Sequence, residues 1–331
     1  MLKRSSILKA LQILLSAAGR PLQATPAFGE EEKFVLCRPR GGLNDTLCQI
    51  ERCREYAERH SRTLLIDSTR SGLLGEFSEF FQLRDDAARV HLDLTDTQLK
   101  FLNTLSCYPH ALRGKLDAYQ PVYSSEARNF LDKNTGIRPS FDFKKDYEEA
   151  VLVHEQCGGG KKSFALLDRI ALAESLRPIV LSRIQALGEG YIAIHVRNTD
   201  YKTEYEAFFR TLYPRVTNRS LLVCSDDAAV IAHARAFFDK SKIMTSSRAE
   251  YSENRPPHNW HKKRGSKRQR KAITTNAIVD LIALGRAKKL YFANVMGDFP
   301  SGYSRLAEYL CRHKRVIDAL LGIKKSRLTL K

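Results

Sequence analysis

The sequence lacks the patterns that mark several common classes of protein. No Cys-x-x-Cys pair occurs among its seven cysteines, which argues against a zinc ribbon or a thioredoxin-type redox site. No run of residues is apolar for long enough to span a bilayer. No G-x-G-x-x-G follows a predicted strand, which disfavours a Rossmann-type oxidoreductase. Gly (18) and Pro (11) are too few for a collagen-like or low-complexity chain.

The composition is that of a globular and strongly basic protein. Its 331 residues exceed one ordinary core and suit two domains. Lys and Arg number 55 against 37 Asp and Glu, which gives a net charge of +18. Such a charge favours polyanions: nucleic acid, an anionic membrane surface or a phosphorylated small molecule. An odd number of scattered cysteines is typical of a reducing compartment. We therefore expect a cytoplasmic protein, either free or peripheral to a membrane.

Residues 1–30 form a basic and apolar extension. The pattern resembles a secretory signal peptide, but Lys9 and Gln12 interrupt its apolar stretch. One helical face collects Leu8, Leu11, Leu15 and Ala18. This spacing favours an amphipathic helix, and a cleaved signal peptide stays the alternative.

Two series of strands alternating with helices follow. The first series, in residues 31–180, predicts strands Phe34–Cys37, Thr63–Asp67 and Val151–Val153, with helices Thr46–His60, capped by Asn44 or Asp45, and Phe164–Leu176. The second, in residues 181–331, predicts strands Tyr191–Val196, Leu221–Cys224 and Leu290–Ala293, with helices Glu204–Leu212, Ala228–Phe238, Asn276–Gly285 and Tyr303–Leu310. This alternation indicates an α/β protein with two Rossmann-like domains facing across a cleft. The boundary is expected between Arg177 and Gly190. Residues 85–150 give no clear order of elements.

One segment of the C-terminal half is unusually basic. Arg255–Lys271 holds eight Lys and Arg in 17 residues and no acidic residue. This pattern predicts an exposed mobile loop that recruits an anionic partner.

Ligands of parallel sheets bind beyond the carboxyl ends of the strands, so the loops at those ends are the first candidates for a site. In the first loop, Gly41 and Gly42 let backbone N–H groups approach an anion, and Arg40 and Asn44 lie beside them. A tight turn before a capped helix explains the same residues equally well. A glycine run at 158–160 does not match a P-loop and is expected to be a flexible loop.

Three loops of the second series carry further candidates. His195 and Arg197 alternate along one strand, so they share a face, and Arg can clamp a phosphate. Asp227 follows a strand, where it either accepts hydrogen bonds from a ribose or base or caps the next helix. Ser301 and Ser304 at a helix start form either a phosphate cradle or a simple cap.

These loops, in this order, resemble the GT-B fucosyltransferase superfamily, which includes α-1,2-, α-1,6-, protein O- and nodulation-type fucosyltransferases. The resemblance rests on Gly41–Asn44, His195–Asp200, Ser225–Asp227, Asn276–Leu281 and Ser301–Ala307. The chain departs from the family pattern at three places. It lacks the glycine before Asn44, it has Asn198 where the family has a second arginine, and Asn294–Pro300 is an extra segment before Ser301.

The resemblance implies an inverting transferase that uses GDP-fucose or a related nucleotide sugar as donor and a glycan or glycolipid as acceptor. Arg197 would neutralise the pyrophosphate with His195 beside it, and Asp227 would contact the guanosine. Ser301 and Ser304 would hold the phosphates. The donor or the acceptor would be held from the N-terminal side by the loop of Arg40, Gly41, Gly42 and Asn44. The base candidates are Asp45, Asp200 and Glu204.

No cofactor is implied, and no metal either, because no Asp-x-Asp motif follows a strand. The rival reading is a basic nucleic-acid-binding protein, in which Trp260 could stack on a base. No helix-turn-helix, RNA-recognition or zinc-finger pattern supports that rival, so nucleic acid is a disfavoured partner.

Overall fold

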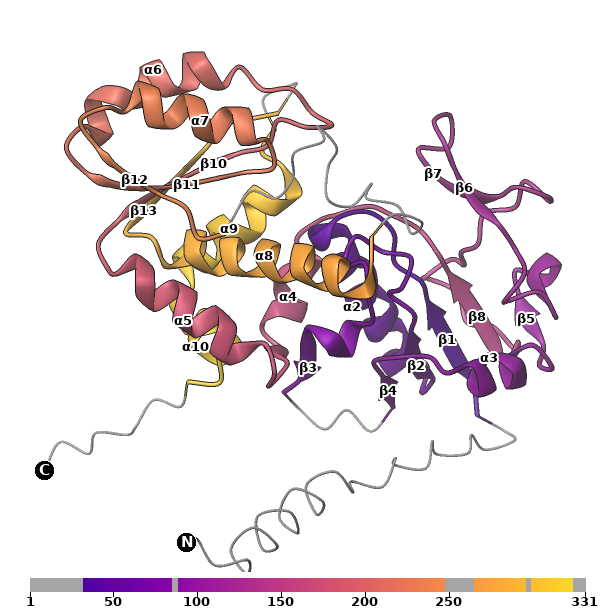
Figure 1. Ribbon diagram of the computed structural model, residues 1–331. Coiled ribbons are helices and arrows are strands. Elements are labelled where there is room, and N and C mark those ends of the chain that lie inside the picture. Colours follow the sequence, from indigo (N-terminus) through magenta and orange to yellow (C-terminus); the bar gives the residue numbers. More distant parts are fainter. Residues whose placement is uncertain (1–31, 85–88, 248–264, 296–298, 324–331) are drawn as a thin grey trace, which may run out of the picture. The chain divides into compact units, whose positions relative to one another are not determined.

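Two parallel β-sheets make up the framework of the chain (Figure 1). The structure is a computed structural model and describes residues 32–84, 89–247, 265–295 and 299–323. The predicted amphipathic helix in residues 1–30 therefore lies outside the described residues. Within the described part, no helix is both long and apolar enough to cross a membrane.

The first sheet has the strand order β4-β2-β1-β8-β5, and its strands are all parallel. Their bounds are Phe34–Cys37 (β1), Thr63–Ile66 (β2), Val90–His91 (β4), Cys107–Tyr108 (β5) and Val151–His154 (β8). Every residue of β1, β2 and β8 is buried, which explains why these strands are apolar throughout instead of alternating. The predicted strand–helix–strand unit is confirmed, with α2 (Leu43–Arg59) as its helix.

The second sheet has the order β12-β11-β10-β13 and is also parallel. Its strands are Ile192–Val196 (β10), Ser220–Ser225 (β11), Lys242–Met244 (β12) and Lys289–Phe292 (β13). Neighbouring residues of β10 belong to different clusters: Ala193 packs with residues of α8 and α9, and Ile194 packs with residues of α6 and α7. Helices therefore cover both faces of this sheet.

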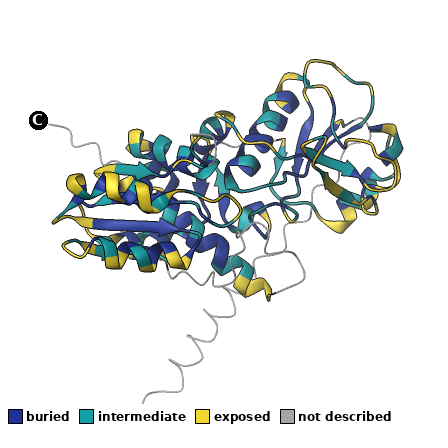
Figure 2. Cartoon of the chain, turned by 90° about the horizontal axis from the view of Figure 1, so that it is seen from above, coloured by how far each residue is buried: buried dark blue, intermediate teal, exposed yellow. Residues whose placement is uncertain are grey.

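The helices of this half are α5 (Arg177–Leu187), α6 (Tyr205–Val216), α7 (Ala228–Phe237), α8 (Lys267–Arg286), α9 (Gly302–Arg312) and α10 (Lys314–Leu320). The first half adds α3 (Asp96–Leu102), α4 (Lys162–Leu167) and two antiparallel pairs, β3 (Phe81–Leu83) with β9 (Ile170–Leu172) and β6 (Pro121–Ser124) with β7 (Asn129–Asp132). Short 3-10 turns occupy Phe77–Glu79 and His110–Leu112. Figure 2 shows the strands in the buried colour between helices whose outer turns are exposed.

Three local predictions differ from the structure. The expected helix Phe164–Leu176 is broken, because α4 ends at Leu167 and Ile170–Leu172 pairs with β3 as a strand. Neither Asn44 nor Asp45 is the N-cap of α2, since Gly42 holds that position and both residues lie in the first turn. The described end of the basic segment is a helix and not a loop.

That helix begins where the sequence offers a capping box. Ser266 accepts a hydrogen bond from the N–H of Gln269 (3.3 Å), and the Gln269 side chain accepts one from the N–H of Ser266 (2.7 Å). These two bonds satisfy N–H groups that a helix start otherwise leaves unpaired, so the Lys and Arg residues from Lys267 onward continue into α8. Residues 255–264 of this segment, with Trp260, lie outside the described residues.

Both sheets contribute to one hydrophobic cluster. It contains Leu47 and Ile50 of α2, Ala193 of β10 and Leu306 and Leu310 of α9. Residues from Lys33 onward accordingly form a single contact unit. The predicted division into domains at residues 180 and 181 stays a prediction.

Candidate functional site

The turn after β1 is shaped by glycine and by the first carboxylate of α2. Gly41 has a φ of +88°, a conformation that favours glycine, and an added Cβ would come within 2.8 Å of the Asp45 side chain. Gly42 then serves as the N-cap of α2 without a side-chain bond. The turn therefore requires glycine at position 41, whereas Gly42 has an ordinary extended backbone with room for a Cβ.

Asn44 connects three loops that are far apart in the sequence. Its side-chain N–H donates to Ser163 Oγ (2.9 Å), and its Oδ1 accepts from the N–H of Gly160 (3.0 Å). A Cβ on Gly302, the first residue of α9, would lie 3.0 Å from Asn44 Cβ. The start of α2, the glycine loop after β8 and the start of α9 therefore meet at one buried amide.

Asp45 lies on the same turn and binds the glycine loop after β8. Its Oδ1 accepts a hydrogen bond from the N–H of Gly158 (2.9 Å). Burial raises the pKa of Asp45 above its usual value, and that bond together with the positive charge of Arg197 opposes the rise. Asp45 therefore holds a proton more readily than an exposed aspartate does.

His195 on β10 reaches the start of α9. Its Nδ1 lies 2.8 Å from Ser304 Oγ, which lies 2.9 Å from Ser301 Oγ. Burial, with a contribution from the Arg197 charge, lowers the pKa of His195 to about 3. The imidazole is therefore neutral at physiological pH and acts as a hydrogen-bonding group and not as a cation.

Ser301 and Ser304 take the capping role that the sequence left open. The Ser301 hydroxyl caps α9 by accepting from the N–H of Ser304 (3.0 Å). Both serines are buried. The serine-capped helix start consequently lies directly beside His195.

Arg197 forms a bidentate ion pair with a carboxylate three residues further along the chain. Its Nε and Nη2 lie 2.8 and 2.7 Å from the two oxygens of Asp200. Burial works to lower the pKa of Arg197, but the Asp200 carboxylate outweighs burial and holds that pKa above its usual value. The two side chains are 19% and 21% exposed, so solvent and a ligand can reach the pair.

The loop after Arg197 is closed by buried polar bonds. Asn198 donates to Asp227 Oδ2 (2.8 Å), and Asp227 Oδ1 accepts from the N–H of Ala229 as the cap of α7 (2.9 Å). Asp226 accepts from the N–H of Asn198 (2.7 Å) and from the Thr199 hydroxyl (2.6 Å). The residue that replaces the second family arginine thus joins β10 to β11.

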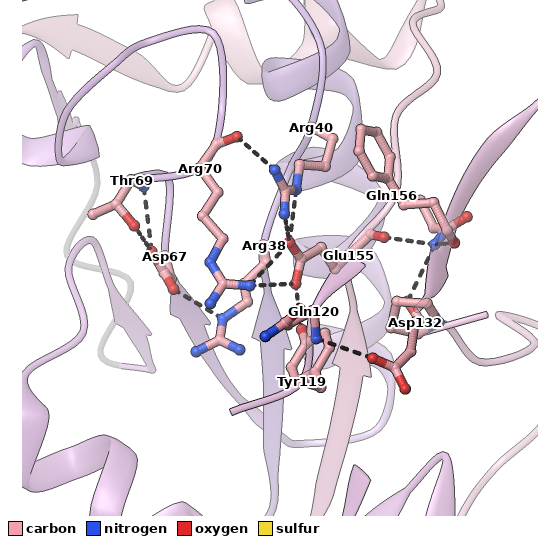
Figure 3. Close-up of polar contacts among 12 residues, drawn as sticks. Arg38, Arg40, Asp67, Thr69, Arg70, Tyr119, Gln120, Asp132, Glu155 and Gln156 are labelled. Carbon is pink, nitrogen blue, oxygen red and sulfur yellow. Dashed lines mark hydrogen bonds and ion pairs between the residues drawn. The ribbon is translucent and has the colours of Figure 1, made fainter. Parts of the chain in front are cut away.

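The remaining candidates lie in different surroundings. Arg40 donates to Glu155 Oε1 (2.6 Å), and its guanidinium lies 4.8 Å from the centre of the Phe130 ring (Figure 3). Glu204 is exposed at the cap position of α6 and makes no side-chain capping bond. Of the three base candidates, Asp200 is paired with Arg197, Asp45 accepts from the N–H of Gly158, and Glu204 has no side-chain capping bond.

Several residues of this site were missed from the sequence. Gly302 and Ser163 lie against Asn44 but are each more than 100 residues away from it in the chain. No local pattern indicates that these residues meet. The glycine run at 158–160 was recognisable from its composition, but its contacts with Asp45 and Asn44 were not. The described residues contain no group of three or more His, Cys, Asp or Glu side chains that could hold a metal ion. Independence from metal stays a prediction.

Comparison with known proteins gives a structural match without a sequence match. No protein-family model and no curated protein matches the sequence. The fucosyltransferase NodZ from Bradyrhizobium aligns with a TM-score of 0.58 and 19% identity, over 84% of this chain and 91% of that chain. A crystal structure of NodZ α-1,6-fucosyltransferase with GDP gives 0.56 and 18%, over 84% and 92%. The apo-form of POFUT1 gives 0.51 and 13%, over 88% and 98%.

These similarities concern the fold. They cover most of this chain and nearly all of each compared chain, at identities below 20%. The resemblance inferred from the motif order is thereby confirmed at the level of architecture. The chain has the α/β fold of the GT-B fucosyltransferase structures.

Proposed function

We propose that the protein is an inverting glycosyltransferase that transfers fucose from GDP-fucose to a hydroxyl of a glycan or glycolipid. The observation that carries the proposal is the convergence of Asn44 with the glycine loop after β8 and with the start of α9, where Ser304 contacts His195. The fold is shared with NodZ, which has been crystallised with GDP and soaked with GDP-fucose.

Arg197 is the residue best suited to the donor pyrophosphate. It ends an apolar strand and already presents two N–H groups side by side to the Asp200 carboxylate. A phosphate group offers the same spacing of oxygens, so the diphosphate can compete with Asp200 for the guanidinium. Charge builds up on the departing GDP, and Arg197 therefore stabilises the transition state more than the bound donor.

The start of α9 supplies further donors for the phosphates. The N-terminal end of a helix carries a partial positive charge and unpaired N–H groups, both of which favour an anion. Gly302 at this position has no side chain, which lets Asn44 pack against the helix start. His195 fixes the serine-capped end through Ser304. Asp227 is proposed to contact the guanosine, in exchange for its bond to Asn198.

Asp45 is the proposed general base. An acceptor hydroxyl attacks the anomeric carbon of fucose while the bond from that carbon to the β-phosphate oxygen of GDP breaks. The hydroxyl proton passes to the Asp45 carboxylate, and the bonding electrons leave with GDP. Because burial raises the pKa of Asp45, its carboxylate is a stronger base than an exposed aspartate. This single displacement inverts the anomeric configuration.

Calorimetry with GDP and UDP tests the donor assignment. We expect GDP to bind and UDP to bind at least tenfold more weakly, which corresponds to about 1.4 kcal/mol. Nucleotide-sugar hydrolysis across a panel of donors then shows which sugar is accepted. Binding of UDP-sugars without any binding of GDP would overturn the assignment.

A further inference from the structure

A cluster of three arginines surrounds one buried carboxylate at the carboxyl end of the first sheet (Figure 3). Glu155 is fully buried, accepts from Arg40, and lies 3.5 Å from Arg70 Nη1. Arg38 binds Asp67 (2.8 Å), and the Tyr119 hydroxyl donates to Glu155. Three guanidinium groups thus face two carboxylates, which leaves one positive charge in excess.

Arg70 is the arginine with the weakest internal contacts. Its Nη1 lies 3.5 Å from both oxygens of Glu155, at the outer limit of a hydrogen bond. Its side chain is 25% exposed, against 2% for Arg38 and 11% for Arg40. The excess positive charge is therefore carried by the member of the cluster that an incoming anion can reach.

An exposed aromatic hairpin lies beside this cluster. On β6, Tyr123 is 58% exposed and Val122 is 45% exposed. The Tyr123 ring lies 5.6 Å from the ring of Phe130 on β7, and Phe130 is the ring that Arg40 covers. An exposed tyrosine combines an apolar face with a polar end, which suits the apolar face and hydroxyl rim of a sugar ring.

Two sets of hydrogen bonds connect the hairpin and the arginine cluster to the loops around the proposed base. The Asn129 side chain of β7 pairs with the N–H and the carbonyl of Cys157 (2.9 and 3.0 Å), and the next residue, Gly158, donates to Asp45. In the other direction, the N–H of Gly72 donates to the carbonyl of Gly41 (2.8 Å), two residues after Arg70. These bonds link the hairpin and the arginine cluster to the loops that surround Asp45 in the chain or bind it.

We propose that Arg70 and Tyr123 form an acceptor subsite for a sugar that carries an anionic group, either a carboxylate or a sulfate. Arg70 pairs with the anion, which takes up the excess positive charge, and Tyr123 packs against the sugar ring. The acceptor hydroxyl is thereby presented to Asp45. The inference deepens the proposed function and rests on it, because it names the acceptor class of that transferase.

Binding of matched oligosaccharides by the full chain tests the subsite. The probes are a short oligouronide, the same oligosaccharide with its carboxylates reduced to alcohols, and a sulfated form of the reduced one. The variants are Arg70→Gln and Arg70→Lys, with Arg210→Gln on exposed α6 as the control. Thermal melting checks that each variant is folded, and GDP titration provides a separate measure of the donor site.

We expect the wild-type chain to bind an acidic oligosaccharide about tenfold more tightly than the reduced one. Arg70→Gln should remove this preference with an unchanged affinity for GDP, whereas Arg70→Lys should keep part of it and Arg210→Gln all of it. Tyr123→Ala should weaken binding of acidic and reduced forms alike, and Tyr123→Phe should restore it.

Equal binding of acidic and reduced forms by the wild-type chain would overturn the subsite, even if GDP binds. An acidic preference that survives in folded Arg70→Gln would also overturn it. Failure of the wild-type chain to bind GDP contradicts the proposed donor and leaves the oligosaccharide comparison unaffected, so the two failures are distinguishable.

Discussion

The carboxyl ends of the two sheets both carry arginine–carboxylate pairs, but the pairs differ in depth. At the first sheet, Glu155 is fully buried and its partner Arg40 is 11% exposed, whereas Arg70 at the edge of the cluster is 25% exposed. At the second sheet, the Arg197–Asp200 pair is about one-fifth exposed. A buried pair is costly to break, because the partner that remains is an unpaired charge away from water. The carboxyl end of the first sheet therefore suits a rigid arrangement of buried charges. The carboxyl end of the second sheet suits exchange of the Asp200 carboxylate for a phosphate.

Removing the central carboxylate of the buried cluster should have the largest effect on stability. Glu155→Gln leaves Arg40 and Arg70 without their anionic partner, and we expect a loss of about 3–5 kcal/mol of the free energy of unfolding. Urea denaturation followed by circular dichroism measures this loss. The control is Glu58→Gln, because Glu58 pairs with Arg54 on an exposed helix surface and should cost less than about 1 kcal/mol. Similar losses in both variants would contradict the comparison.

A buried carboxylate of the second half sharpens the comparison, because it has hydroxyls as its partners. Asp280 on α8 accepts from Ser246 (2.5 Å) and Ser247 (2.9 Å). Burial raises its pKa from 3.8 to about 6, and the serine bonds oppose the rise. The folded protein therefore binds this proton more tightly than the unfolded chain does. The resulting stability is present below pH 3.8 and is lost as the pH rises through about 6.

The difference between wild type and Asp280→Asn isolates this titration. Relative to the variant, the wild-type chain should lose about 2–3 kcal/mol of stability between pH 4 and pH 7.5. Denaturation curves at both pH values give the number. Parallel pH dependences of the two proteins would show that Asp280 does not titrate in this range.

A smaller loss of stability is expected at Asn44, where the loops after β1 and β8 meet the start of α9. Asn44→Ala leaves the N–H of Gly160 and the hydroxyl of Ser163 without that partner, at a cost of about 1–3 kcal/mol. Gln185→Ala on the exposed side of α5 is the matched control and should be nearly neutral. If Asn44 aligns the loops, donor affinity falls with stability, and calorimetry with GDP shows whether it does.

The central strands were predicted from the sequence better than the segments that connect them. Buried strands such as Phe34–Cys37 and Ile192–Val196 are recognisable because their apolar runs are flanked by polar loops. Helix α5 was missed because Pro178 looked like a boundary, although proline is well tolerated in the first turn of a helix. Within residues 85–150, strands such as Val90–His91 and Cys107–Tyr108 are too short to give a periodic pattern.

The site was predictable where a local rule applies. The alternation of side chains along a strand predicts that His195 and Arg197 share a face, whereas the contact of His195 with Ser304, 109 residues away in the chain, was not predicted. The contact of Asp45 with Gly158 depends on how the loops after β1 and β8 are placed, which no local pattern encodes. The same holds for Glu155, whose three arginines come from two other segments of the chain.

Turnover and donor affinity of Arg197→Lys test the central claim most directly. Lysine keeps the charge but loses the planar fork, so a pyrophosphate clamp that acts as GDP departs should lose turnover more than affinity. We predict a fall in kcat of two to three decades, about 2–4 kcal/mol, with a much smaller change in the Kd of GDP and an unchanged melting temperature. Near-normal turnover in the folded variant would remove Arg197 from the site and contradict the transferase account.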